Sequence, residues 1–274
     1  MACAVSGGAD SLALLVLAVA AGCRATAYHV DHGLRPGSAD EAAVVAAAAD
    51  RLGAGFRALS VKVEPGPNLE ARARAARRSA LPADAATGHT ADDQAETVLL
   101  NLLRGAGLDG LAGMRGGPRH PILALRRSET RRLCAEAGLS VVSDPTNVDP
   151  AYRRNRLRHQ VLPLLEEVAE RDVAAVIARQ AELLADDAEL LDRLAVGIDP
   201  TSVDDLARAP APLARRALRS WLRSAEGHPP SAAAVERVME VVRLEARAAE
   251  VGGGLLVRRT AGRLRLEAAP PSPP

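Results

Sequence analysis

The stretch Ser6-Gly7-Gly8-Ala9-Asp10-Ser11 lies between two apolar runs, residues 2–5 and 12–20. This order predicts a strand, a glycine loop and a helix. Adjacent glycines let the backbone turn sharply and bring its N–H groups close to a ligand, and a helix N-terminus favours an anion. The stretch therefore predicts a phosphate site, although it is not a Walker A loop because no Gly-Lys-Ser/Thr follows. The alternative is a glycine turn before a buried helix.

The composition predicts a globular protein whose core is built from Leu, Val and Ala. The chain has 274 residues, of which 48% are hydrophobic and only 1% aromatic. Its net charge is +1, so any nucleic-acid site needs a local cluster of positive charge. Cys3, Cys23 and Cys134 form no CxxC pair, which is typical of a reducing compartment. Residues 12–20 are too few to span a membrane, so we expect a cytoplasmic protein without a membrane partner.

Alternation of strand and helix patterns predicts an α/β domain with a parallel five-stranded sheet and helices on both faces. The expected strands are residues 2–5, 25–30, 56–63, 83–88 and 141–143, with a further edge strand at 119–125. Ligands of such sheets bind beyond the carboxyl ends of the strands, where the strand order reverses. The glycine loop follows the first of these strands, so we expect the site there.

From about residue 169 the alternation stops, and a smaller, mostly helical domain is expected. Helices are predicted over 172–194, 213–223 and 231–244, followed by a hairpin and a disordered tail at 270–274. We therefore divide the chain into an α/β domain that contains the predicted phosphate site (1–165) and a mostly helical domain (166–274). Arginines gather at 72–78 and 215–223, and these clusters are candidate contacts to phosphates.

A group of acidic residues follows the predicted strand 83–88, in the order Gly88-His89-Thr90-Ala91-Asp92-Asp93-Gln94-Ala95-Glu96-Thr97. Carboxylate oxygens beyond a strand end suit a magnesium ion that bridges phosphates. The alternative is helix capping, with Thr90 as the N-cap and Asp93 as its partner three residues later. One residue can serve both purposes.

Two further segments carry candidate site residues. His29, Asp31 and His32 end the predicted strand 25–30, at the same edge of the sheet as the glycine loop. The segment Tyr152-Arg153-Arg154-Asn155-Arg156-Leu157-Arg158-His159 places four arginines within six residues. Such a cluster repels itself unless an anion lies nearby, and the alternative is a solvated helix face.

Taken together, these segments resemble a known family. Ser6–Ser11 matches the Ser-Gly-Gly-x-Asp-Ser pattern of the PP-loop ATP pyrophosphatases. With His29–Arg35, Gly88–Thr97 and Asp144–His159 in this order, the chain resembles the tRNA(Ile)-lysidine synthetases. The resemblance implies that ATP adenylates O2, the oxygen on C2 of the wobble cytidine of a tRNA(Ile) with a CAU anticodon, releasing pyrophosphate. Free L-lysine then attacks C2 and releases AMP.

The resemblance also implies roles for individual residues. Nucleotide binding falls to the following residues: Ser6, Gly7, Gly8, Ala9, Asp10, Ser11, His29, Asp31, His32 and His89. Magnesium is assigned to Asp10 and Asp93, with Asp93 alternatively on the incoming lysine and with Asp92 and Glu96 in reserve. The catalytic set is Asp10, Asp93, Arg154 and Arg158, whose guanidinium groups would stabilise charge on the activated cytidine or its phosphate.

Two other readings of the sequence are weighed against this one. Another PP-loop enzyme, such as a tRNA thiolase or an amide-forming synthetase, is disfavoured because the three cysteines are scattered and no glutamine-hydrolysing domain is visible. A non-catalytic nucleotide-binding module would need the phosphate loop but neither the acidic cluster nor the arginines. The pattern leaves a monomer and a homodimer both open.

Overall fold

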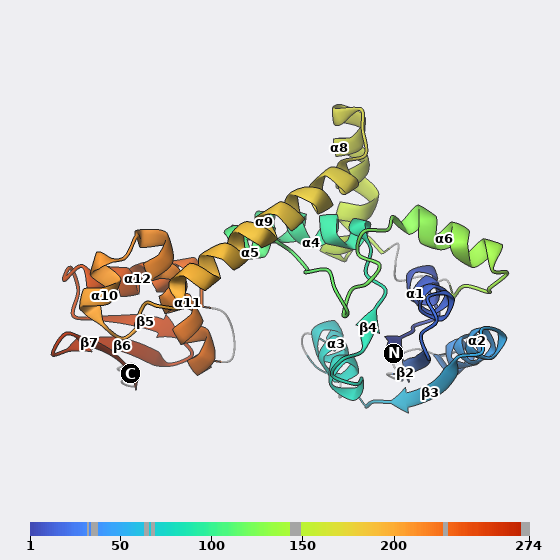
Figure 1. The fold of residues 1–274 in the computed structure, drawn as a ribbon, viewed down its shortest axis with the longest axis horizontal. Coiled ribbons are helices and arrows are strands. Elements are labelled where there is room, and N and C mark those ends of the chain that lie inside the picture. The colour runs from blue at the N-terminus through green and yellow to red at the C-terminus, as the bar shows by residue number, and fades with distance from the viewer. Residues whose placement is uncertain are drawn as a thin grey trace. The chain divides into compact units, whose positions relative to one another are not determined.

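The computed structural model describes residues 1–31, 33, 38–62, 66, 69–142, 149–226 and 230–269. The chain packs into two units, of which the first comprises Met1–Arg104 and Leu111–Glu182. The second unit comprises Gly105–Gly110 and Leu183–Pro274 (Figure 1). The functional division after residue 165 stays a prediction. Within the described residues, every helix is too short or too polar to cross a lipid bilayer.

The first unit contains a parallel sheet of four strands in the order β3-β2-β1-β4. The strands are β1 (Ala2–Ala4), β2 (Thr26–Asp31), β3 (Gly55–Ser60) and β4 (Ala86–Thr87). The α/β class is as predicted, but the described residues form four strands rather than five. Residues 141 and 142 are not in a strand, although the N–H of Val142 donates to Gly7 O at 2.9 Å. Residues 143–148, including the DPTN sequence, lie outside the described residues.

The predicted edge strand at 119–125 is also wrong, because these residues form turns. Pro118 and Pro121 have no N–H group and therefore cannot extend a ladder of hydrogen bonds. Single backbone bonds still tie the segment to the sheet: Thr87 N–H donates to Arg119 O at 2.9 Å, and Ala91 N–H donates to Leu125 O at 2.8 Å.

The core of the first unit joins the sheet to α1 (Ala9–Ala20), α2 (Ser38–Arg51) and α6 (Arg127–Glu136). Helix α1 is apolar on all sides because it is buried among these elements. Fully buried members of this core are Cys3, Leu12, Leu15, Ala27, Val45, Ala49, Ala86 and Cys134. Coverage of the other face, where α3 (Leu69–Ala80) is expected, stays a prediction, since several of its side chains are not described.

The strand order reverses between β1 and β4. The chain runs from β1 outward through β2 to β3 and then returns to add β4 on the other side of β1. Ala4, near the end of β1, is in register with Tyr28 of β2 and Thr87 of β4. The segments after β1, β2 and β4 therefore leave the same edge of the sheet, which is where ligands of such folds bind.

Four further helical segments of the first unit carry the acidic group and the arginines singled out in the sequence. Helix α4 (Ala91–Leu103) follows β4, while α7 (Arg153–Arg156), a π-helical turn η2 (Leu157–Val161) and α8 (Leu162–Ala169) form one continuous run. The wide turn includes a bond from Leu162 N–H to Leu157 O. It precedes Pro163, which has no N–H and disturbs a regular helix. Ala95 of α4 and Leu162 of α8 share a small core with Ala174 of α9 (Val173–Ala195).

The second unit is part helical and part antiparallel sheet. It contains α10 (Val203–Arg208), α11 (Ala211–Glu226) and α12 (Ala232–Val242). Three strands follow in the order β5-β6-β7: β5 (Ala248–Gly252), β6 (Leu255–Thr260) and β7 (Arg263–Ala268). The sequence predicted only the hairpin of β6 and β7. It missed β5, which is Ala-rich and irregular in register between Glu250 and Gly252. The glycine-rich segment 105–117 contains the short helix α5 (Leu108–Leu111).

Candidate active site

The glycine loop is held by hydrogen bonds among its own residues. Ser11 Oγ donates to Gly8 O at 2.9 Å and accepts from Ser6 N–H at 3.1 Å. Gly7 has a φ of +90°, and a Cβ there would lie 2.7 Å from Val142 Cγ2, so only glycine fits. No side chain among the described residues caps the start of α1, whose first N–H groups have no partner within the helix. The loop therefore offers backbone donors to an anion.

Asp93 divides its two carboxylate oxygens between structure and site. Oδ2 accepts from the backbone N–H of Thr90 at 3.0 Å and from its hydroxyl at 3.1 Å, as the capping interpretation predicts. Oδ1 instead accepts from Arg127 Nη2 at 2.9 Å. The capping interpretation is therefore confirmed, while Oδ1 is directed at the charged cluster and the magnesium role of Asp93 stays a prediction.

Two neighbours of Asp93 have structural contacts. Asp92 forms a bidentate pair with Arg126, with both N–O distances 3.0 Å, and accepts from Arg127 N–H at 2.7 Å. Gln94 holds the turn at residues 112–114, since it accepts from Met114 N–H and donates to Met114 O, both at 2.8 Å. The acidic segment after β4 thus fixes the start of α6 through Asp92 and the turn at residues 112–114 through Gln94.

Glu96 is completely buried and is surrounded by three arginines. Arg154 Nε donates to Oε2 at 2.6 Å, Arg158 Nε donates to Oε1 at 2.7 Å, and Arg127 Nη1 donates to Oε1 at 3.2 Å. Arg154 and Arg158 also lie 3.5 and 3.6 Å from Asp93 Oδ1. The two arginines predicted from the sequence therefore face the acidic cluster rather than solvent.

Asp10 is held by α6, a helix to which the sequence pattern assigned no role. Thr130 Oγ1 donates to Asp10 Oδ1, and Arg127 Nε donates to Oδ2 at 3.3 Å. Burial raises the pKa of Asp10, and the charge of Asp93 raises it further, against the opposing effects of Thr130 and Arg127. The predicted metal pair, Asp10 and Asp93, therefore meets at one guanidinium.

The pKa values of Asp93 and Asp92 are lowered, in contrast to that of Asp10, while the pKa of Arg127 is raised. Burial alone would raise the pKa of Asp93, but the charge of Arg127 and the bond from Thr90 N–H outweigh it, so the pKa is lowered. Burial also opposes ionisation of Asp92, whose pKa is nevertheless lowered by the hydrogen bonds from Arg126 and Arg127. Burial would lower the pKa of Arg127, but its carboxylate partners raise it. These shifts favour the charged forms of Asp92, Asp93 and Arg127.

The histidines predicted to bind nucleotide have different surroundings. His29 is 3% exposed, and its Nδ1 lies 3.0 Å from Val5 O, while Nε2 is buried without a partner. Asp31 accepts from Gly33 N–H at 2.8 Å. His89 Nδ1 lies 2.7 Å from Thr87 Oγ1 and 3.3 Å from Nδ1 of His120. Burial lowers the pKa of His120, as does Arg119. His32 lies outside the described residues.

The sequence analysis missed Arg127, Thr130 and His120. Arg127 contacts Asp10, Asp93 and Glu96 at once. In the sequence it is one of two adjacent arginines before an ordinary helix, and only the fold shows which of the two faces the acidic cluster. Within the described residues, no group of three or more His, Cys, Asp or Glu is arranged to hold a metal ion by itself.

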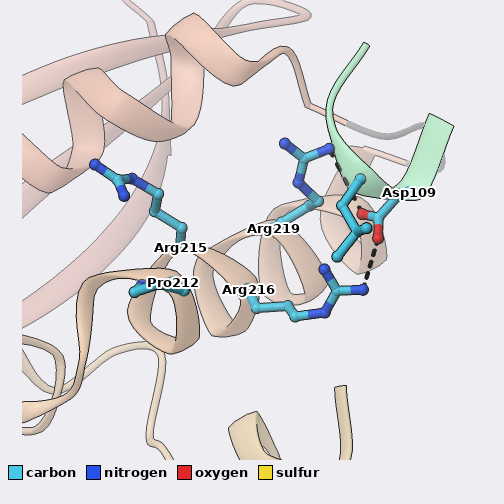
Figure 2. A pocket seen from close by; sticks show the side chains of 6 residues that line it. Asp109, Pro212, Arg215, Arg216 and Arg219 are labelled. Carbon is cyan, nitrogen blue, oxygen red and sulfur yellow. Dashed lines mark hydrogen bonds and ion pairs between the residues drawn. The ribbon is translucent and has the colours of Figure 1, made fainter. Parts of the chain in front are cut away.

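A second charged feature lies on α11 in the second unit (Figure 2). Arg215, Arg216 and Arg219 line a pocket together with Leu108, Asp109 and Pro212. Arg216 is the least exposed of the three arginines and donates to Asp109 and to Asp192, both at 2.6 Å. Arg215 pairs with Glu236 at 2.9 Å. Arg223, one turn beyond Arg219, is exposed. At 72–78, Arg77 and Arg78 are exposed as well.

Comparison with known families and proteins assigns both parts of the chain. Residues 1–165 match the PP-loop domain, and residues 202–265 match the TilS substrate-binding domain. A protein of Nocardia farcinica (strain IFM 10152) named tRNA(Ile)-lysidine synthase is 42% identical over 100% of this chain and 93% of its own length. Proteins of the same name from Rhodococcus erythropolis (strain PR4 / NBRC 100887) and Mycolicibacterium paratuberculosis (strain ATCC BAA-968 / K-10) are 46% and 47% identical over 80% of this chain. The matched regions span 72% and 73% of the lengths of these two proteins, respectively.

A solved structure shares the fold. The U34-tRNA thiolase NcsA from Methanococcus maripaludis, with its 4Fe-4S cluster, superposes with a TM-score of 0.53. The match covers 67% of this chain and 72% of that protein at 20% sequence identity. At this identity the likeness supports the fold alone.

Proposed function

The chain belongs to the tRNA(Ile)-lysidine synthase family, and from this membership we propose that it is the ligase itself. It joins the amino group of lysine to C2 of the wobble cytidine of tRNA(Ile) with a CAU anticodon. ATP first adenylates the cytidine and releases pyrophosphate, and lysine then displaces AMP. The single observation that supports this assignment most strongly is that Asp10 and Asp93 contact the same guanidinium, beside Arg154 and Arg158.

The phosphate end of the site is the glycine loop. The backbone N–H groups of Gly7, Gly8, Ala9 and the first turn of α1, together with the Ser6 hydroxyl, would bind the phosphates of ATP. Ser11 would shape the loop through its bonds to Ser6 N–H and Gly8 O. His29, with its buried and unpartnered Nε2, and Asp31, His32 and His89 would line the nucleotide or the base. Holding the phosphates of ATP next to the cytidine lowers the entropy cost of bringing the two reactants into the reactive geometry.

The donor set fits a magnesium ion that is bound together with ATP. Asp10 Oδ2 and Asp93 Oδ1 both accept hydrogen bonds from Arg127, so two hard oxygen donors face the same guanidinium group. Mg²⁺ in proteins takes one or two carboxylates and completes its shell with phosphates and water. Asp10 and Asp93 would hold the ion, which supplies neutralisation of phosphate charge. In the alternative role, Asp93 binds the incoming lysine.

The guanidinium groups form the other end of the site. Arg154 and Arg158 are held by the buried Glu96, so their orientation is fixed before any substrate binds. Planar guanidinium groups suit contacts to a base or a phosphate, and these two would stabilise charge on the activated cytidine. The base must leave its stack to be reached, which costs less in an anticodon loop than in a duplex.

The second domain, with its helices and its small sheet, would hold the tRNA. The match of residues 202–265 to a substrate-binding domain and the arginines of α11 support this role, because phosphodiester contacts come mainly from such side chains. Lysine, tRNA and ATP are all cytoplasmic, which is the compartment we propose.

The thiolase reading receives no support from the cysteines. Cys3 and Cys134 are buried and Cys23 is exposed, all as free thiols.

A pyrophosphate-release assay tests the ligase directly. Release should require tRNA(Ile) with a CAU anticodon, and AMP should appear only when lysine is added. Release without tRNA, or none under any condition, contradicts the proposal.

A further inference from the structure

Arg127 occupies the centre of the acidic cluster. Its Nε donates to Asp10 Oδ2 at 3.3 Å, its Nη2 donates to Asp93 Oδ1 at 2.9 Å, and its Nη1 donates to Glu96 Oε1 at 3.2 Å. The three carboxylates come from two segments, the start of α1 and the first turns of α4. One side chain therefore bridges the glycine loop and the acidic segment.

The position of this guanidinium is fixed by its surroundings. The backbone N–H of Arg127 donates to Asp92 Oδ2 at 2.7 Å, which anchors the start of α6 to α4. Its side chain is only 13% exposed. Thr130, one turn later, holds the other oxygen of Asp10. The inward oxygens of Asp10 and Asp93 are thus both occupied by one cationic group.

Charge within this set is balanced. Asp10, Asp93 and Glu96 carry three negative charges, and Arg127, Arg154 and Arg158 carry three positive charges, through the ion pairs described above. Removal of Arg127 would leave one uncompensated negative charge in a largely buried cluster. A divalent cation would then be attracted more strongly, because a unit charge within a few ångströms of a doubly charged ion changes its binding on the order of tenfold or more.

We propose that Arg127 is a stand-in cation, whose guanidinium occupies the place between Asp10 and Asp93 that Mg²⁺ takes when nucleotide binds. The ion and the guanidinium compete for Asp10 Oδ2 and Asp93 Oδ1, so Arg127 must release at least one carboxylate as the ion enters. In the nucleotide-free protein Arg127 keeps the affinity for free divalent cations low. The phosphates of ATP supply the further oxygen donors that tip the competition. The proposal rests on the proposed function in taking these two carboxylates as the ligands.

Because the Arg127 guanidinium also contacts Glu96, its movement away from the carboxylates also changes the contacts of Glu96 at the arginine end of the site. Arg154 and Arg158 share Glu96 with Arg127. When Arg127 leaves, Glu96 keeps two arginine partners instead of three. Arg127 is thus a positioning residue that links occupancy of the nucleotide end to the arginines that face the cytidine.

The test measures binding of Mn²⁺, as a probe for Mg²⁺, to the protein without nucleotide, tRNA or lysine. Free Mn²⁺ is followed by electron paramagnetic resonance. Arg127→Met should bind Mn²⁺ about tenfold more tightly than the unsubstituted protein, or more so. The matched control is Arg126→Met, since Arg126 contacts Asp92 and Asp172 but neither Asp10 nor Asp93. Its Mn²⁺ affinity should stay within about twofold of the unsubstituted protein.

A second variant keeps the test decisive if Arg127→Met does not fold. Arg127→Lys retains the charge that balances the cluster, but one ammonium cannot reach the three carboxylates as a guanidinium does. Its Mn²⁺ affinity should fall between those of the unsubstituted protein and Arg127→Met. Equal or weaker Mn²⁺ binding in the folded variants overturns the proposal, because a residue that only stabilises the site would give that result. Lysine incorporation is measured separately, so failure here is distinct from failure of the proposed function.

Discussion

Gly88 lies against the backbone of Asp10 so closely that no side chain fits between them. A Cβ on Gly88 would be 2.5 Å from Asp10 O and 2.9 Å from Ser11 Cα. Gly88 follows β4 and Asp10 is in the first turn of α1. This approach brings the acidic segment beside the glycine loop, and it explains why a residue without a side chain stands at the end of β4.

Gly88→Ala should therefore separate the two segments. We expect a loss of about 2 kcal/mol or more in the free energy of unfolding, because the overlap is with backbone that cannot rotate away. Urea unfolding measures it, and ATP binding should weaken in parallel. Gly107→Ala is the control, since no atom lies within 4 Å of the Cβ position there. Equal stability of the two variants would show that Gly88 is not a close contact.

Asp93→Asn should abolish lysine incorporation while the fold survives. The amide oxygen can still accept the Thr90 bonds that cap α4, but the negative charge that faces Arg127 is lost. We expect a fall of about 10²-fold or more in turnover, measured with labelled lysine, and an unchanged circular dichroism spectrum. Near-normal turnover would remove Asp93 from the mechanism, whichever of its two roles is correct.

Arg154→Ala should reduce activity on tRNA more than it reduces ATP binding. Arg154 contacts Glu96 and Asp93 at the end of the site away from the glycine loop. We expect lysine incorporation to fall about 10²-fold with the Kd for ATP changed by less than about threefold. The neighbouring Arg153→Ala is a matched control because that side chain is exposed. An equal loss of both properties would assign Arg154 to folding.

The ion pair of Asp92 predicts a pH dependence of stability. Its folded pKa lies below the ordinary value of 3.8, so its stabilising effect is complete above that value and is lost as the pH falls through the folded pKa. The difference in unfolding free energy between the unsubstituted protein and Asp92→Asn should be constant from about pH 5 to 7 and shrink below about pH 4. Urea unfolding over this range measures it. A difference that grows in acid has the wrong sign for this account.

The arginines of α11 predict how tRNA binding depends on salt. If Arg223 contacts one phosphate, Arg223→Ala should reduce the slope of log K against log salt by about 0.7 to 0.9. Arg208→Ala is the control, because Arg208 is also exposed but lies on α10 and pairs with Asp204. Filter binding at several salt concentrations gives both slopes. Identical slopes in the two variants would place the tRNA elsewhere.

Much of the fold of the first unit could be predicted from the sequence, because the patterns that indicate it involve residues close together in the chain. The glycine loop, the order of strands and helices, and the cap formed by Thr90 and Asp93 all depend on residues that are close in the chain. Within the described residues no strand forms at 141 and 142, where Val142 N–H makes a single bond to Gly7 O. The expected edge strand at 119–125 is absent because Pro118 precedes it and Pro121 interrupts it. Strand β5 was missed because its composition does not differ from that of a loop.

The carboxylates of the site could be predicted from the sequence, but the side chains that contact them could not all be. Asp10 and Asp93 follow strand ends, which topology brings to one edge. Arg127 and Thr130 lie more than 30 residues further along the chain than Asp93, and their proximity depends on how α6 packs against α1. No spacing rule connects these positions. The complete burial of Glu96 among three arginines is likewise a property of the fold.

Nucleoside analysis of tRNA(Ile) after incubation with the protein, ATP and labelled lysine shows whether the chain makes lysidine. We expect labelled lysidine at the wobble position of the CAU anticodon, with one pyrophosphate and one AMP formed for each lysine joined. The label should be absent when Asp10 or Asp93 is replaced by asparagine. A tRNA that remains unlabelled while ATP is cleaved would contradict the claim that these two carboxylates serve a single ligation site.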